Sequence, residues 1–125
     1  MFKEVRRSKN HNNKHQDPVM GLSLPKGEFY FYTSALDLIK KGKKKDIALM
    51  FYINEKEKKV RFDYEDPEAD NYHLNSSSRG YSRFTSKDLG VEFANLFDLD
   101  MEGKHYFLVR DGEIESPRFE LLLKV

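Results

Sequence analysis

The chain has 125 residues, enough for one domain with one modest core. It contains no cysteine, which excludes a disulfide scaffold, a thiolate metal site and a cysteine nucleophile. No run of about 18 apolar residues occurs, so we expect neither secretion nor a membrane span, and a cytoplasmic location. Residues 1–26 carry six basic and two acidic side chains (+4), whereas the remainder carries sixteen basic and nineteen acidic ones (−3). The charge pattern therefore predicts a basic arm attached to a mildly acidic body.

The polar N-terminal segment defines the first boundary. Residues 1–18 are rich in Asn, Lys and His and show no helical or strand periodicity, as expected for an extended arm. The sequence VMGLSLP at 19–25 is either a short strand or an apolar packing strip. We therefore divide the chain into a basic arm (1–26) and a single α+β domain (27–125).

The first half of the domain predicts a strand, a helix and a hairpin. Alternation in EFYFYT (28–33) places Phe29 and Phe31 on one face of a strand and the tyrosines on the other. TSALDLIKKGK (33–43) predicts a short helix in which Ser34 caps the amide of Asp37, with basic residues at its C-terminus and Gly42 just beyond it. DIALMFYI (46–53) and VRFDY (60–64), joined by a charged turn, form a hairpin.

The second half repeats this order after an acidic loop, a short strand at NYHLN (71–75) and a flexible joint. YSRF (81–84) predicts a strand, and Thr85 caps the following helix toward Asp88. The spacing of Leu89, Phe93, Leu96 and Phe97 is that of an amphipathic helix. GKHYFLV (103–109) is the next strand, the Asp-Gly pair in RDGE (110–113) favours a type I′ turn, and RFELLLKV (118–125) closes the chain.

Each half thus follows the order strand, helix, strand, turn, strand, in units 27–66 and 78–125. The order can arise twice by chance in a small α+β protein. The alternative is an internal duplication, because one unit has too few apolar side chains to enclose a core alone. We expect two βαββ units that interleave around a pseudo-two-fold axis to form a small β-barrel.

The segments FYFYTSALDLI (29–39) and SRFTSKDLGVEF (82–93) start the two units. A paired βαββ unit resembles, in topology, the swapped-hairpin family of AbrB, MazE and SpoVT transcription factors, although Thr-Ser stands where that family has Gly and Pro around GRVVIP. The resemblance implies DNA binding through a basic face of the barrel and its arms. It places Arg83 at the start of the second unit, opposite Phe31 in the first.

The chain is also similar to small uncharacterised proteins from phages and mobile elements of Bacteroidetes. That likeness implies a fold without an activity, and it adds a phage particle or phage-infected cell to the expected locations.

Several basic side chains are candidates for nucleic-acid binding. Cations of the arm can neutralise phosphates, and Arg79 and Arg83 lie near Tyr30, Tyr32, Tyr72 and Tyr81, which can stack on single-stranded bases or fill the core instead. The predicted nucleic-acid-binding residues are Lys3, Arg6, Arg7, Lys9, Lys14, Arg79 and Arg83.

No pattern predicts catalysis or a metal. His11 and His15 lack an acidic or thiol partner, and Ser34 and Ser86 have no neighbouring histidine and are explained as helix caps. We therefore expect a non-enzymatic nucleic-acid-binding protein of regulatory type, without cofactor or metal, with DNA as the expected partner. The alternative is a structural protein of a phage or mobile element whose arm docks on a neighbouring subunit in a homo-oligomer.

Overall fold

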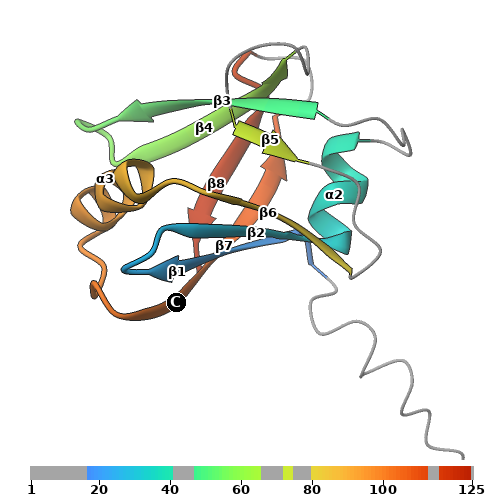
Figure 1. The fold of residues 1–125 in the computed structure, drawn as a ribbon. Helices are drawn as coiled ribbons and strands as arrows, with labels where there is room; N and C mark the ends of the chain where they lie inside the picture. The colour runs from blue at the N-terminus through green and yellow to red at the C-terminus, as the bar shows by residue number, and fades with distance from the viewer. Residues whose placement is uncertain (1–16, 41–46, 66–71, 75–79, 113–115, 125) are drawn as a thin grey trace, which may run out of the picture.

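The computed structural model describes residues 17–40, 47–65, 72–74, 80–112 and 116–124 (Figure 1). Predictions for residues 1–16, for Gly42 and for the acidic loop lie outside these residues. The strands are β1 Val19–Leu24, β2 Glu28–Tyr32, β3 Ile47–Asn54, β4 Lys59–Glu65, β5 Tyr72–Leu74, β6 Tyr81–Thr85, β7 Gly103–Asp111 and β8 Phe119–Leu123, and the helices are α2 Thr33–Lys40 and α3 Lys87–Phe97.

The eight strands form one antiparallel sheet that curls into a nearly closed barrel. Their order is β5-β3-β4-β8-β7-β1-β2-β6. The two end strands approach each other, since the ring of Tyr72 in β5 lies 5.0 Å from that of Phe84 in β6. The predicted small β-barrel is confirmed, but the expected α+β class is corrected to a mostly-β protein with two short helices. Most of the apolar surface is carried by strands, and each helix contributes only one short stripe.

Strand alternation explains the core. Phe29 and Phe31 of β2 are fully buried, whereas the alternating Tyr30 and Tyr32 are half-buried on the outer side. The same period sends Met20 and Leu22 of β1 inward. The predicted alternation is therefore confirmed, and residues 19–24 of the strip at 19–25 form a strand. β1 is an interior strand of the sheet, between β7 and β2.

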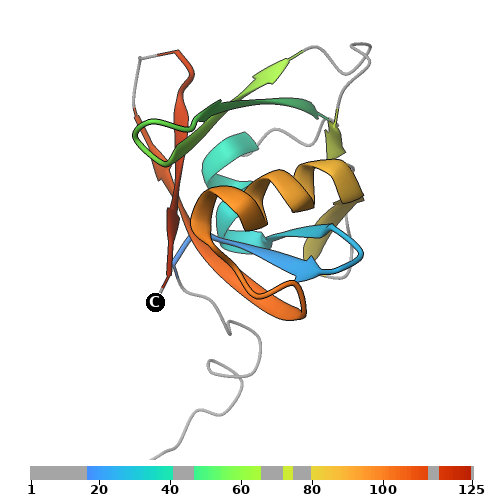
Figure 2. The same cartoon turned by 90° about the vertical axis from the view of Figure 1, so that its left-hand side faces the viewer.

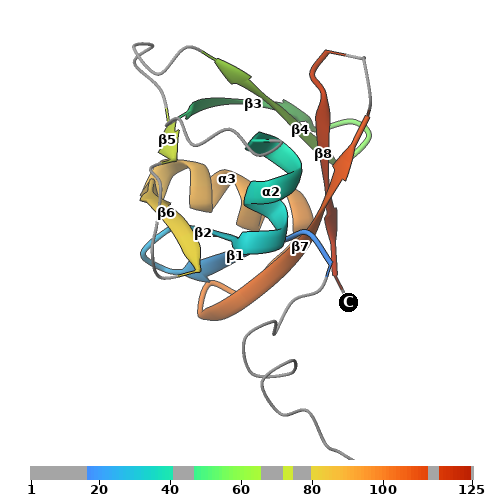
Figure 3. The same cartoon turned by 90° about the vertical axis from the view of Figure 1, so that its right-hand side faces the viewer.

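The two helices lie at opposite ends of the barrel, as Figures 2 and 3 show from its two sides. Helix α3 inserts Phe93, whose ring packs edge-on against Phe29 at 5.2 Å and Phe107 at 5.5 Å. Helix α2 buries Ala35 and Ile39. The stripe predicted for α3 is confirmed, because Leu89, Phe93 and Leu96 are buried and Phe97 packs against the same core.

The N-cap of α3 differs from the prediction by one residue. Ser86, not Thr85, is the cap, and its hydroxyl accepts a hydrogen bond from the Leu89 amide at 3.2 Å. Thr85 is the last residue of β6, paired with Glu28 of β2. Either side chain could cap a helix, and the strand pairing decides which one is free to do so.

The predicted type I′ turn at Asp111-Gly112 is also wrong. Asp111 pairs with Phe119, and the Gly112 amide donates to the carbonyl of Arg118 at 2.7 Å, so the connection between β7 and β8 is longer than two residues. The register that pairs the buried Val109 and Leu121 takes precedence over the local turn preference. The predicted hairpin of β3 and β4 is confirmed, with Asn54 paired to Lys59.

Among the residues described, neither helix has the length and apolar character needed to traverse a bilayer.

Candidate functional site

Four tyrosines gather on the outer side of strands β1, β2, β6 and β7. Tyr30 and Tyr32 come from β2, Tyr81 from β6 and Tyr106 from β7, and all four are half-buried. They point outward because their strand neighbours, among them Phe29, Phe31 and Phe107, occupy the core. Together with Lys104 and Arg83, these tyrosines make up what we call the tyrosine face.

Strand register brings these residues together. Gly21 in β1 pairs with Tyr106 on one side and with Tyr30 on the other, and Tyr30 pairs with Arg83. One row across four strands therefore reads Tyr106, Gly21, Tyr30, Arg83. Tyr32 pairs with Tyr81 in the adjacent outward row of the β2–β6 ladder, and the rings of Tyr30 and Tyr81 meet edge to face at 5.5 Å.

Gly21 is the floor of the face. A Cβ atom at this position would lie 3.2 Å from the Tyr32 hydroxyl oxygen and 3.5 Å from Cε1 of Tyr106. The absence of a side chain thus allows both rings to close over the backbone of β1.

Lys104 supplies a positive charge among the rings. Its Nζ lies 4.7 Å from the centroid of the Tyr30 ring, within the range of a cation–π contact. Partial burial lowers the pKa of Lys104, but the neighbouring Tyr32 and Tyr106 outweigh this effect and the net shift is upward. Burial raises the pKa of the Tyr32 hydroxyl, against the opposing influence of the Lys104 ammonium. At neutral pH the face therefore holds a charged lysine and a neutral tyrosine.

Arg83 is engaged within the face. Its Nη1 atom lies 3.0 Å from Oε2 of Glu28, and a hydrogen bond with Tyr30 raises the pKa of the guanidinium. Glu28 therefore compensates the charge of Arg83. Lys104, in contrast, forms no ion pair with a carboxylate of the described residues.

Of the four tyrosines expected either to stack on bases or to fill the core, three lie on this face. Tyr72 does not, because it packs inward against Phe51 at 5.5 Å and Phe84 at 5.0 Å. Tyr106 and Lys104 were missed, since only the pairing of β7 with β1 brings them beside β2. Of the predicted nucleic-acid-binding residues Arg83 is described, and Lys3, Arg6, Arg7, Lys9, Lys14 and Arg79 lie outside the described residues.

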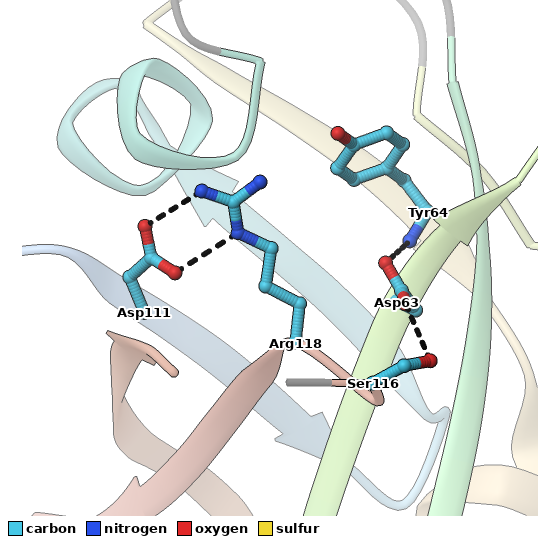
Figure 4. Close-up of polar contacts among 5 residues, drawn as sticks. All are labelled: Asp63, Tyr64, Asp111, Ser116 and Arg118. Atoms are coloured by element: carbon cyan, nitrogen blue, oxygen red, sulfur yellow. Dashed lines mark hydrogen bonds and ion pairs between the residues drawn. The ribbon is translucent and has the colours of Figure 1, made fainter. Parts of the chain in front are cut away.

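A second polar cluster joins β4 to the β7–β8 hairpin (Figure 4). Arg118 contacts Asp111 through two hydrogen bonds, of 3.0 and 3.2 Å, which raise the pKa of its guanidinium. Asp63 accepts hydrogen bonds from the Ser116 hydroxyl at 3.2 Å and from the Tyr64 amide at 2.9 Å. Arg118 and Asp111 pair with each other, and Asp63 is held by two neutral donors, so we assign this cluster to the stability of the hairpin.

Other parts of the described surface offer less. A hollow of about 560 Å³ between α3 and the β3–β4 hairpin is lined by Ile53, Glu55, Lys58, Glu92, Asn95 and Leu96. Its polar lining consists of two carboxylates, one ammonium and one amide, without a histidine or a hydroxyl. Within the ranges that the structure describes, no three histidine or carboxylate side chains are grouped as metal ligands.

No family model matches the chain, and no curated protein and no solved structure is significantly similar to it. The tyrosine face is therefore interpreted from its own geometry.

Proposed function

We propose that this protein is a non-enzymatic nucleic-acid-binding protein of regulatory type, which contacts bases with its tyrosine face and phosphates with its basic arm. The observation that carries the proposal is the grouping of Tyr30, Tyr32, Tyr81 and Tyr106 around Lys104 on one outer face. Aromatic rings on a strand surface, with a cation among them, are how many small barrels hold nucleic acid.

The two residues that precede β1, Asp17 and Pro18, support one binding site to which both the arm and the tyrosine face contribute. The Ser34 hydroxyl donates to the carbonyl of Asp17 at 2.6 Å, and the Val109 amide donates to that of Pro18 at 2.8 Å. These bonds fix the point where the arm meets β1, whose first residue, Val19, pairs with Leu108 two positions from Tyr106. Asp17 and Pro18, the described residues before β1, therefore lie near the tyrosine face.

We further infer that the barrel arose by internal duplication, and that β1 and β5 extend the βαββ unit expected from the sequence to ββαββ. Around the barrel the strands follow the order β4, β8, β7, β1, β2, β6, β5, β3. Exchanging β1 with β5, β2 with β6, β3 with β7 and β4 with β8 gives the same ring in the opposite direction. A two-fold axis perpendicular to the barrel axis has this effect, and a chance arrangement of eight strands would rarely have it.

Backbone details support the same exchange. Gly27 and Gly80 both adopt positive φ (75° and 82°) immediately before β2 and β6. The Thr33 amide donates to the carbonyl of Gly80 at 3.1 Å, and the Ser86 amide donates to that of Gly27 at 2.8 Å. In each unit, the residue that joins the strand to the helix therefore donates a backbone hydrogen bond to the glycine that precedes the corresponding strand of the other unit.

In this alignment the axis passes through the Tyr30–Arg83 pair. Arg83 therefore corresponds to Tyr30, and Phe31 to Phe84, one residue away from the correspondence of Arg83 with Phe31 expected from the sequence. Interleaved units of this kind are what the resemblance to the swapped-hairpin transcription factors implies. In that family the two units come from two chains, and the resemblance supports DNA among the ligands.

Fluorescence anisotropy with labelled duplex DNA, single-stranded DNA and RNA tests the proposal. Affinity should fall steeply as salt rises, because each neutralised phosphate releases counterions. The triple variant Arg6→Ala, Arg7→Ala, Lys9→Ala should lower both the affinity and its salt dependence. The triple variant Lys56→Ala, Lys58→Ala, Lys59→Ala, in the β3–β4 turn and at the start of β4, removes the same charge from another surface and is the control. Absence of binding to all three probes at low salt would exclude the proposal, and the alternative of a subunit-docking arm would then be tested by light scattering.

A further inference from the structure

We propose that the tyrosine face binds one single strand of nucleic acid, as a complex with one protein molecule and in one chain direction. This inference rests on the proposed function and narrows its ligand class. It departs from what a two-fold symmetric DNA-binding surface would do, which is to read a palindromic duplex.

The first step is that the two halves of the face have diverged. Across the Tyr30–Arg83 pair, Tyr32 corresponds to Thr85, and Tyr81 corresponds to Glu28. The side chains of the face therefore do not follow the two-fold symmetry of the strand order.

The flanking strands differ in the same way. The Gly21–Tyr106 pair of β1 and β7 corresponds to the His73–Ala48 pair of β5 and β3. Tyrosine rings packed over a glycine therefore occur in one half only. A ligand with two equivalent halves would contact two different surfaces.

The second step concerns what the rings can contact. Tyr32 and Tyr106 lie over Gly21, and Tyr30 lies beside them with Lys104 at 4.7 Å from its ring centroid. A tyrosine ring can stack on a base only when that face of the base is exposed, and in a duplex the faces are covered by neighbouring bases. Rings on a strand surface therefore favour an unpaired strand over a duplex.

The third step is the position of the charges. Lys104 is exposed and lies between the tyrosine rings and the rim of the barrel, where β7 begins. The arm begins beside the opposite end of β1, because Val19 pairs with Leu108 whereas Ser23 pairs with Lys104. Phosphates of one extended strand can meet Lys104 at one end of the face, whereas Val19 and Leu108 at the other end carry no charge. This difference between the ends gives the bound strand a direction.

Binding of a 12-nucleotide dT strand, a 12-nucleotide U strand and a palindromic 24-base-pair duplex at one salt concentration tests the inference. Tyr106→Ala should weaken single-strand binding between about 5-fold and 150-fold, the range measured for loss of one stacked base. Tyr106→Phe should retain most of the affinity, because it keeps the ring. Tyr52→Ala, which removes a tyrosine that is 47% exposed on β3, should have little effect.

Two further measurements separate a binding role from a structural one. Lys104→Ala should lower the slope of log affinity against log salt by about 0.7 for a single strand. Because the chain has no cysteine, Lys26→Cys in the β1–β2 turn gives a single labelling site, and energy transfer from it should differ between strands labelled at the 5′ and the 3′ end.

The outcomes distinguish the two proposals. Preference for the single strands with a ratio of one to one, lost in Tyr106→Ala but kept in Tyr106→Phe, supports the inference. Preference for the duplex, a ratio of two proteins per palindrome, or equal energy transfer from the two ends overturns it while leaving nucleic-acid binding in place. Binding to no probe overturns both. Circular dichroism of each variant shows whether the barrel has folded. If Tyr106→Ala has not folded, the salt dependence of Lys104→Ala and the energy-transfer measurement still test the inference.

Discussion

Gly27→Ala should be among the most destabilising single-methyl additions to this barrel. Gly27 has φ +75°, and a Cβ atom there would lie 2.3 Å from the Ser86 carbonyl oxygen and 2.8 Å from Cα of Lys87. Both contacts are backbone atoms at the start of α3, which cannot rotate away as a side chain can. The Gly27 carbonyl also accepts the Ser86 amide at 2.8 Å, so a shift that relieves the clash strains this hydrogen bond.

Gly80→Ala is the matched control. Gly80 has φ +82°, but its added Cβ would meet nothing closer than the Thr33 Oγ1 atom at 3.6 Å. An alanine in the left-handed region costs about 1–2 kcal/mol, and this should be most of the effect at Gly80. At Gly27 two further costs add to this backbone cost: about 1 kcal/mol for the weakened hydrogen bond from the Ser86 amide, and the steric overlap of the new Cβ atom with the backbone of α3. The free energy of unfolding should therefore fall by about 3–5 kcal/mol in total.

Urea unfolding followed by circular dichroism measures both variants. With an m-value of about 1–3 kcal/mol/M, the loss at Gly27 should lower the unfolding midpoint by roughly 1 M or more. The m-values should stay unchanged, because neither variant alters the surface exposed on unfolding. If the free energies of unfolding of Gly27→Ala and Gly80→Ala agree within about 0.5 kcal/mol, the close contact between the β1–β2 turn and α3 does not constrain the fold as argued.

Three further predictions concern the core, the helix cap and alkaline pH. Phe93→Ala removes a fully buried ring and should cost about 3–5 kcal/mol in urea unfolding, whereas a loss below 1 kcal/mol would mean that α3 does not complete the core. Ser86→Ala should cost about 1 kcal/mol and Thr85→Ala clearly less, and the reverse ranking would restore Thr85 as the cap. The pKa values of Tyr32 and Lys104 are raised in the folded state above their ordinary values of 10.0 and 10.5. The two protonated groups therefore contribute their full stability at pH values below these ordinary values. That contribution is lost as the pH rises through the pKa values of the folded state. Guanidinium unfolding should therefore show falling stability above about pH 10, with a smaller fall in Tyr32→Phe, and an identical pH profile for that variant would contradict the assignment.

Much of the local structure could be predicted from the sequence because it depends on side-chain period. Alternation in 28–32 separates Phe29 and Phe31 from the outward tyrosines, and the spacing of Leu89, Phe93 and Leu96 predicts α3. The repeated order of elements also predicted a barrel. Each helix or strand must bury its apolar face, whichever element of the fold packs against that face, and this requirement explains these features.

The candidate site was predictable only in part. Tyr30, Tyr32 and Tyr81 were chosen for their strand spacing, and the same spacing wrongly included Tyr72, since period alone cannot say which face of a strand points inward. Tyr106 lies far along the chain from Tyr30, and nothing near it in the sequence marks it as a partner.

By itself the sequence determined the elements, their order and the alternation of their faces. The tertiary structure decided register: Gly21 between Tyr30 and Tyr106, Ser86 in place of Thr85 as cap, and a long β7–β8 connection in place of an Asp-Gly turn. The physical reason is the range of the interactions. Periodicity is set by a residue's own backbone, whereas register is set by how distant strands must slide to close one shared core.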